Sequence, residues 1–246
     1  MALFNKKGTQ AFIAANTQQK RLVLAFRGTE PTSIKDIQSD IDARMRVSPV
    51  AKSKLHKGFS EAYEVIGEDI QLFLQNDQYH DYQLYITGHS LGGALATIAA
   101  KRLTHRGGIA ACYTFGSPKV GNRDWVSDMK TPLYRIVNAA DCVPLMPLGD
   151  TVITVLSYLI KKLKVLKFVE TFLDQYKGYI HCGDIRFLTF CKPGDYSDAK
   201  LLTNTTFFQR LKGFILKGVG MAPLADHSIT TYRKKLAIIA VNRNSP

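Results

Sequence analysis

The sequence predicts an α/β domain in which a mostly parallel central sheet carries helices on both of its faces. Short apolar runs of strand length alternate with longer segments of helical periodicity, as in parallel strands joined by crossover helices. The chain has 246 residues, enough for one sizeable core, and neither an internal repeat nor a low-complexity linker divides it. We therefore expect a single domain over residues 1–246.

The first expected elements are two strands, at residues 10–16 and 21–27, joined by a polar turn. Residues 28–57 are mostly polar and are expected to be irregular. Apolar side chains at helical spacing then predict an amphipathic helix over 59–75, with its buried face at Phe59, Ala62, Tyr63, Ile66, Ile70 and Phe73. Such a helix returns the chain to the sheet for the next strand.

The middle of the chain repeats this alternation. Residues 82–87 are expected to form a short apolar strand, and 91–103, which are rich in alanine and leucine, a buried helix. Further strands are expected at 109–115 and 133–137. A strand-like run at 185–190 and a C-terminal helix beyond it complete the expected sheet and its cover.

The chain carries a strong excess of positive charge. Its 33 Lys and Arg residues against 20 Asp and Glu residues give a formal net charge of +13. Such a balance favours polyanionic partners, meaning nucleic acid or an anionic lipid surface, although solubility alone is an alternative reading. The sequence has neither a stacking-aromatic motif nor a known binding module for nucleic acid, so no nucleic-acid partner is expected.

The cysteines and the apolar runs exclude several classes of protein. Four cysteines are too few for a disulfide framework, and none has the C-x-x-C spacing of a zinc site: Cys112, Cys142, Cys182 and Cys191. The first residues contain no secretory signal, and no apolar run reaches the roughly 18 residues of a membrane span. The default expectation is a cytoplasmic or peripheral membrane protein, with export by another route left open.

A serine between two glycines, in the stretch YITGHSLGGALA, carries the chemistry. A bare G-x-S-x-G arises by chance in roughly one chain of this size in ten, because Gly and Ser each make up about 7% of residues. Here an apolar strand leads into Ser90 and a helix leads out, the setting of a nucleophile elbow. Gly88 and Gly92 leave room for the sharp turn. The N–H of Leu91, at the helix start, can stabilise an oxyanion.

A serine nucleophile needs a histidine base and an orienting carboxylate, which follow it in this order of the chain: Ser, Asp or Glu, His. Asp141 lies just past the strand at 133–137, at the sheet edge where such sites form. Two histidines follow. We expect His227, on a loop before the C-terminal helix, to be the base, and His181 to be a structural, hydrogen-bonded histidine. His89 shares the tight turn of the serine, so its ring is not expected to reach Oγ.

Seven segments together resemble one family. They are FRGT at 26–29, DIQSD at 36–40, LHKGF at 55–59, GHSLGG at 88–93, TFGSPKVGN at 114–122, YRIVNAADCVP at 134–144 and DHS at 226–228. In wording, order and rough separation they are similar to the class 3 lipases, the fungal-type triacylglycerol lipases of the α/β-hydrolase fold. Thioesterases and peptidases share the serine elbow but not the surrounding segments.

The resemblance implies roles for individual residues. It implies that Ser90 is the nucleophile, Asp141 the orienting acid, His227 the general base and acid, and Thr29 and Leu91 the oxyanion hole. It implies no cofactor, no metal and no obligate protein partner. The implied substrate is a lipid ester, with triacylglycerol as the leading expectation. Alternatives are a phospholipase A1 or galactolipase acting on polar membrane lipids and, more distantly, an inactive lipid-binding protein.

Two segments depart from the family pattern. Residues 28–58 resemble its lid region, but the central part is polar and lacks the usual tryptophan. Residues 150–220 form an insertion before His227, expected to be helical. Within it, 151–177 is apolar and basic, and 206–217 places Phe207 and Phe214 on one face beside basic residues. We therefore expect the insertion to act as the lid or to contact lipid interfaces, with an extra helix on the core as the alternative.

Overall fold

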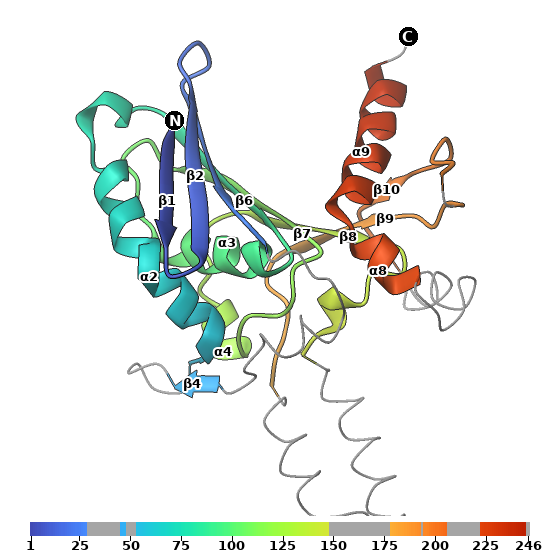
Figure 1. Cartoon of the computed structure of the whole chain (residues 1–246), viewed down its shortest axis with the longest axis horizontal. Coiled ribbons are helices and arrows are strands. Elements are labelled where there is room, and N and C mark those ends of the chain that lie inside the picture. The colour runs from blue at the N-terminus through green and yellow to red at the C-terminus, as the bar shows by residue number, and fades with distance from the viewer. Residues whose placement is uncertain (29–44, 48–52, 148–177, 193, 206–221, 245–246) are drawn as a thin grey trace, which may run out of the picture.

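The computed structural model describes residues 1–28, 45–47, 53–147, 178–192, 194–205 and 222–244 (Figure 1). Within these residues, eight strands form one sheet in the order β1-β2-β3-β6-β7-β8-β9-β10. Their bounds are Ala2–Lys6, Thr9–Asn16, Arg21–Phe26, Gln83–His89, Ile109–Phe115, Leu133–Asn138, Asp184–Leu188 and Leu201–Leu202. In this order each strand from β3 to β9 pairs in parallel with the next. The pairs β1-β2, β2-β3 and β9-β10, toward the two edges, are antiparallel. The mostly parallel sheet is as predicted.

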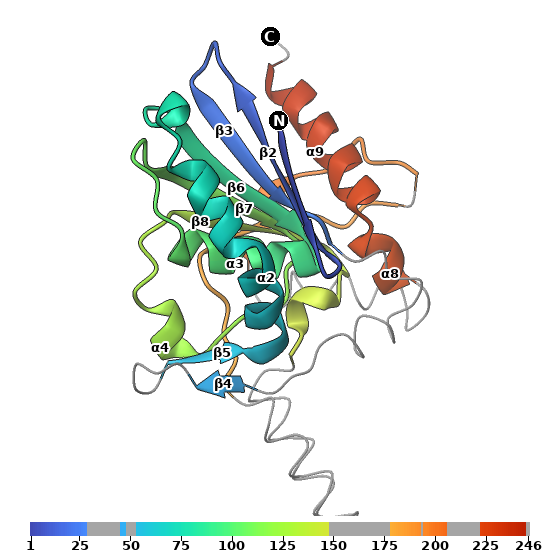
Figure 2. The same cartoon turned by 60° about the vertical axis from the view of Figure 1, so that its left-hand side comes forward.

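Helices cover the sheet from both sides, as predicted (Figures 1 and 2). Helix α2, Lys57–Leu74, and helix α3, Leu91–Arg102, lie on one face. The short helix α8, Ala222–His227, and helix α9, Ile229–Asn244, lie on the other. A one-turn helix α4, Arg123–Val126, lies near the short strands β4, Met45–Val47, and β5, Lys54–His56. Among the helices of the described ranges, none is long and apolar enough to cross a bilayer.

The alternation of side chains along the strands divides the core in two. On the α2 and α3 face, strand and helix side chains form the larger cluster, with Leu24, Ile66, Ile70, Ile86 and Leu95 almost fully buried. On the α9 face, Ile136 and Leu188 pack with Tyr232 and Ile239. Strand β7 serves both clusters, because Cys112 faces the first and Phe115 the second. The C-terminal ends of the parallel strands meet along one edge between these two layers.

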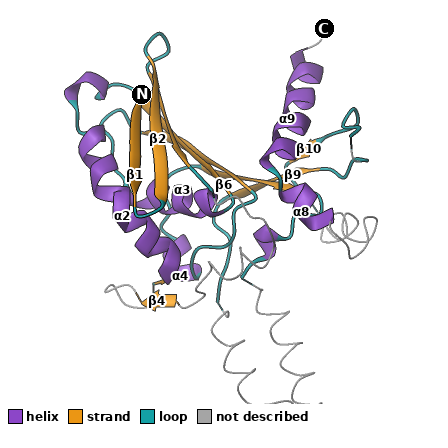
Figure 3. Cartoon of the chain, in the orientation of Figure 1, coloured by secondary structure: helices purple, strands orange, loops and turns teal. Residues whose placement is uncertain are grey.

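The secondary structure agrees with the sequence for most elements (Figure 3). The strands expected at 10–16, 21–27, 82–87, 109–115 and 133–137 and the helices at 59–75 and 91–103 are present with small shifts of their ends. Strand β1 was not predicted. It pairs with β2 across a turn at Lys7 and Gly8, both with positive φ. Residues 28–57 are not wholly irregular, because β4 and β5 form a two-stranded antiparallel sheet there.

Several expectations lie outside the described residues. They concern most of the lid-like segment 28–58, Thr29 within it, and the parts of the insertion at 148–177 and 206–221. The described parts of 150–220 contain β9 and β10 of the main sheet.

Candidate active site

Ser90 stands in the turn between β6 and α3 in a backbone conformation that few residues adopt. Its φ of 56° and ψ of −126° fall in a region where a side chain crowds its own backbone, at a typical strain of about 1–3 kcal/mol. The Ser90 N–H donates to the carbonyl of Phe115 at 2.9 Å, which ties the turn to the neighbouring strand β7. The sharp turn places the serine hydroxyl at the edge of the sheet.

The two flanking glycines are required by close backbone approaches. A Cβ on Gly88 would lie 2.1 Å from the carbonyl oxygen of Gly92. A Cβ on Gly92 would lie 2.4 Å from the carbonyl oxygen of Phe26 on strand β3. Neither neighbour can move aside, because each is part of the main chain of a buried element. The G-x-S-x-G pattern is therefore dictated by packing at this elbow.

The three residues expected to form a triad lie in one hydrogen-bonded row. The Ser90 hydroxyl is 2.8 Å from Nε2 of His227. Nδ1 of His227 is 3.0 Å from each carboxylate oxygen of Asp141. All three residues are buried. In this row, the Nδ1–H donates to the carboxylate and leaves Nε2 free to accept the serine proton.

The parallel sheet brings together residues that are far apart in sequence. Asp141 follows β8 in a turn in which its own N–H donates to the carbonyl of Asn138 at 2.9 Å. His227 is the last residue of helix α8 rather than part of a loop, which corrects the expected setting. Gly116, just past β7, leaves the space between them, because a Cβ there would lie 2.6 Å from Asp141 Oδ2 and 3.0 Å from His227 Nδ1.

Two more donors hold the carboxylate of Asp141. The N–H of Val143 donates to Oδ1 at 2.9 Å, and the hydroxyl of Tyr232 donates to Oδ2 at 2.6 Å. Burial and the adjacent Asp141 raise the pKa of Tyr232 well above its ordinary value, so the hydroxyl keeps its proton at neutral pH. The carboxylate is therefore fixed in position by donors on two different elements.

A second buried network fastens α8 and α9 to strand β8. The side-chain amide of Asn138 donates to the carbonyl of Asp226 at 2.9 Å, and the carboxylate of Asp226 accepts from the N–H of Ala140 at 3.0 Å. The ammonium group of Lys235 donates to Oδ1 of Asn138 and to the carbonyl of Thr189, both at 2.7 Å. These bonds set the position of His227, because it directly follows Asp226.

The ring of His89 makes its hydrogen bond to His227 and not to Ser90 Oγ, which agrees with the expectation that it does not reach the serine hydroxyl. Its Nε2–H donates to the carbonyl of His227 at 2.6 Å, and the two imidazole rings lie 4.6 Å apart. Burial, together with the neighbouring His227, lowers the pKa of His89 to about 4. The ring is therefore neutral at physiological pH and acts as a fixed donor.

The other predicted site residues have clear outcomes. His181 is hydrogen-bonded through Nε2 to the carbonyl of Pro144 at 2.7 Å, which confirms it as a structural histidine. Leu91 is the first residue of α3, where its N–H has no partner within the helix. Thr29 lies outside the described residues. Among the residues that are described, no group of three His, Cys, Asp or Glu side chains gathers as metal ligands would.

Tyr232 and Lys235 are the participants that the sequence did not reveal. Both lie on α9, and the signal that could have identified them is their spacing: with Leu236 and Ile239 they occupy positions i, i+3, i+4 and i+7 of one helix face. A lysine inside such a face is unusual, because lysine is rarely buried without partners. A stripe of this kind next to a candidate histidine therefore indicates a buried polar network.

Known proteins match the chain over the part that contains Ser90 and Asp141. Residues 23–151, more than half of the chain, match the family "Lipase (class 3)". A lipase of Rhizomucor miehei is 36% identical over 150 residues, which cover 56% of this chain and 41% of that protein. The chain therefore spans well under half of this relative.

Solved structures extend the match to most of the fold. The crystal structure of a lipase from Rhizopus microsporus var. chinensis aligns with a TM-score of 0.63 at 27% identity, over 92% of this chain and 71% of the other. A triacylglycerol lipase whose catalytic centre is described as a serine protease triad aligns with a TM-score of 0.59 at 26% identity, over 81% and 68%. These alignments confirm the predicted α/β-hydrolase fold.

Proposed function

Because the chain belongs to the class 3 lipase family, we propose that it hydrolyses carboxylic esters of lipids through an acyl-enzyme on Ser90. The observation that carries the proposal is the position of His227, 2.8 Å from the Ser90 hydroxyl and 3.0 Å from Asp141. A serine hydroxyl is a poor nucleophile until a base accepts its proton. The buried row supplies that base and holds it in the required tautomer.

The proposed reaction has two halves. Ser90 Oγ attacks the ester carbonyl carbon while its proton passes to Nε2 of His227, and Asp141 stabilises the resulting imidazolium. The tetrahedral intermediate collapses, and His227 gives the proton to the departing alcohol. Water then loses a proton to His227, attacks the acyl-enzyme and releases the fatty acid. As the second tetrahedral intermediate collapses, His227 gives the proton that it took from water to Ser90 Oγ. The first half therefore restores neutral His227, and only the second half restores the Ser90 hydroxyl.

Charge on the carbonyl oxygen needs donors in both halves. We assign this role to the N–H of Leu91, at the N-terminus of α3, and to Thr29. An N-terminal N–H has no partner in its own helix and adds the positive end of the helix dipole. Donors of this kind typically contribute about 2.7–4 kcal/mol to the transition state.

Triacylglycerol is the substrate that we propose first, since a structurally similar protein is described as a triacylglycerol lipase. The net charge of +13 favours a second candidate, the polar lipids of anionic membrane surfaces, cleaved by phospholipase A1 or galactolipase activity. Residues 151–177 and 206–217 are proposed to bring the protein to such surfaces. We propose that the protein reaches either kind of lipid without a further protein partner.

The test is hydrolysis of triacylglycerol, phospholipid and a short soluble ester side by side, each below and above its aggregation concentration. Ser90→Ala should lose about 10⁴-fold or more of the activity on every substrate, and adding His227→Ala should cost little more, because the two residues act as a unit. Ser127→Ala is the matched control, since this exposed serine lies on the surface next to α4. Folded Ser90→Ala protein with near-normal activity would refute the proposed reaction, and activity confined to one lipid class identifies the substrate.

A further inference from the structure

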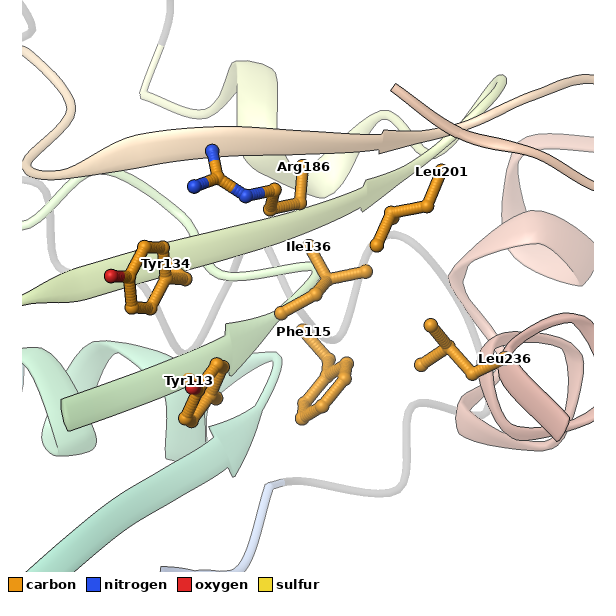
Figure 4. A pocket seen from close by; sticks show the side chains of 7 residues that line it. All are labelled: Tyr113, Phe115, Tyr134, Ile136, Arg186, Leu201 and Leu236. Carbon is orange, nitrogen blue, oxygen red and sulfur yellow. The ribbon is translucent and has the colours of Figure 1, made fainter. Parts of the chain in front are cut away.

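A cavity of about 430 Å³ lies on the face of the sheet that carries α9 (Figure 4). Side chains from β7, β8, β9, β10 and α9 line it, and Ser90, Asp141 and His227 are not among them. Its size falls within the range of small-molecule sites, roughly 300–1,000 Å³. No role in the proposed hydrolysis accounts for this cavity.

The two ends of the cavity differ in chemistry. At one end, the Tyr113 and Tyr134 rings stack with centroids 5.3 Å apart, and the Arg186 guanidinium lies 4.8 Å from the centroid of Tyr134. At the other end, Figure 4 shows Leu201 and Leu236 facing one another across the space. Phe115 and Ile136 form the floor between the ends. The lining is therefore amphipathic along its length.

Arg186 has donors left for an anion. One of its terminal nitrogens donates to the carbonyl of Ile185 at 2.9 Å. The nearest carboxylate in the described part of the chain is Asp184, at 4.0 Å, which is beyond hydrogen-bonding distance, and its side chain is largely exposed. A guanidinium has five N–H groups in a fork that matches a carboxylate. Stacking on Tyr134 holds this fork at the rim of the cavity.

We propose that this cavity binds a long-chain carboxylate anion, with the carboxylate on Arg186 and the alkyl chain running toward α9. Charge complementarity selects the head group, and the apolar lining accepts the chain, since each buried methylene adds to affinity. Tyr113 is 39% exposed, so the polar end opens to solvent and the head group stays partly hydrated. A fatty acid is also the product of the proposed function, so the identification of the ligand as product rests on that function. The binding itself does not.

The first test is calorimetry on Ser90→Ala protein with decanoate below its aggregation concentration. The anion should bind, whereas 1-decanol should bind more weakly and decyltrimethylammonium should not bind. Arg186→Gln should weaken decanoate binding at least about tenfold, because it removes a charge-assisted hydrogen bond. The matched control is Arg21→Gln, which removes the same charge from an exposed arginine that lies 5.8 Å over Tyr85 outside the cavity. Arg21→Gln should leave binding unchanged.

The second test locates the ligand. A long-chain carboxylate with a photoreactive diazirine near its tail should label peptides from β7, β8 or α9, and Leu236→Trp should suppress this labelling by filling the apolar end. Absence of decanoate binding, equal losses with Arg186→Gln and Arg21→Gln, or labelling confined to peptides around Ser90 would each overturn the proposal. Hydrolysis is assayed separately on the unsubstituted protein, so failure of the proposed function leaves these binding outcomes readable.

Discussion

His89 explains how the proposed base, His227, is held in place while no second histidine competes for the proton of Ser90. A charged imidazole at this place would repel the imidazolium that the proposed reaction forms on His227. Burial prevents this, because it lowers the pKa of His89 to about 4 and keeps the ring neutral. The neutral ring donates through Nε2 to the carbonyl of His227, and the two imidazole rings pack against each other. We therefore regard His89 as a positioning residue.

The same residue predicts an acid-sensitive fold. The folded state favours neutral His89, so its contribution to stability is complete above the ordinary pKa of 6.5 and is lost as pH falls from 6.5 through about 4. The free energy of unfolding should fall by roughly 3 kcal/mol from this group, since one pKa unit corresponds to about 1.4 kcal/mol. Urea unfolding at pH 7.5, 5.5 and 4.5 measures it. His89→Gln should flatten the pH dependence, and exposed His80→Gln should not. Parallel curves for all three proteins would contradict the prediction.

Helix α9 is the element that joins the site to the rest of the fold. It supplies Tyr232 to Asp141, Lys235 to Asn138 and Thr189, and Ile239 to the smaller core cluster. Helix α8, with His227 at its end, contacts α9, and its Asp226 is hydrogen-bonded to Asn138 at the end of β8 and to Ala140 beyond it. The position of the proposed base is therefore set by a helix packed on the sheet.

Some residues of the candidate site can be predicted from the sequence, and others can be found only from the packing of the elements. The sequence predicts Ser90, Asp141 and His227 as the candidate triad because the elbow glycines, the chain order and the family segments each restrict the choice. It does not predict Tyr232 and Lys235, because a tyrosine and a lysine on a helix are usually ordinary surface or packing residues. Their role depends on burial, which arises only when α9 meets β8. The sequence does not predict strand β1, because its five residues, with lysines at its end, are too few to show the alternation of apolar and polar side chains that marks a strand.

Removing the buried ammonium group of α9 should destabilise the protein. Lys235→Met keeps the length of the side chain but leaves Oδ1 of Asn138 and the carbonyl of Thr189 without this donor. A buried acceptor that loses its partner, here Oδ1 of Asn138, costs about 1–3 kcal/mol, and the half-buried carbonyl of Thr189 adds less because the Cys191 thiol also donates to it. We expect a fall in Tm of several degrees, since about 2–4 °C per kcal/mol applies to a chain of this size. Lys234→Met is the control, because Lys234 is exposed on the same helix. Equal melting temperatures for the two variants would exclude a structural role for Lys235.

The whole molecule combines a net charge of +13 with a sheet face that is only partly covered by described helices. Leu3, Phe12, Val23 and Tyr113 are exposed large hydrophobic residues on strands β1, β2, β3 and β7. The positive charge of the protein attracts an anionic surface from about a Debye length away, whereas apolar side chains stabilise binding only when they touch the lipid. Binding to a charged lipid surface should therefore begin as an electrostatic attraction.

Salt should weaken the binding of the protein to anionic vesicles. The Debye length falls from about 10 Å at 0.1 M salt to about 3 Å at 1 M, so most of the attraction of a +13 chain is screened. Sedimentation with vesicles of mixed phosphatidylserine and phosphatidylcholine should show strong binding at low salt and little at 1 M. Vesicles of pure phosphatidylcholine should bind weakly at both. If the protein bound both vesicle types equally well at every salt concentration, the binding would come from apolar contacts alone, and the prediction would be wrong.

The position of Cys112 makes the elbow observable without any substitution. Its sulfur lies between β7 and α3, 3.6 Å from the carbonyl oxygen of Ala96, and burial raises the pKa of the thiol, so the reactive thiolate is scarce in the folded state. Alkylation of Cys112 therefore requires α3 to separate from the sheet, and its rate reports how often the helix that follows Ser90 opens. Mass spectrometry after timed exposure to iodoacetamide should find the half-buried Cys142 modified first and Cys112 orders of magnitude later. Ligands or substitutions that tighten the elbow should lengthen that delay.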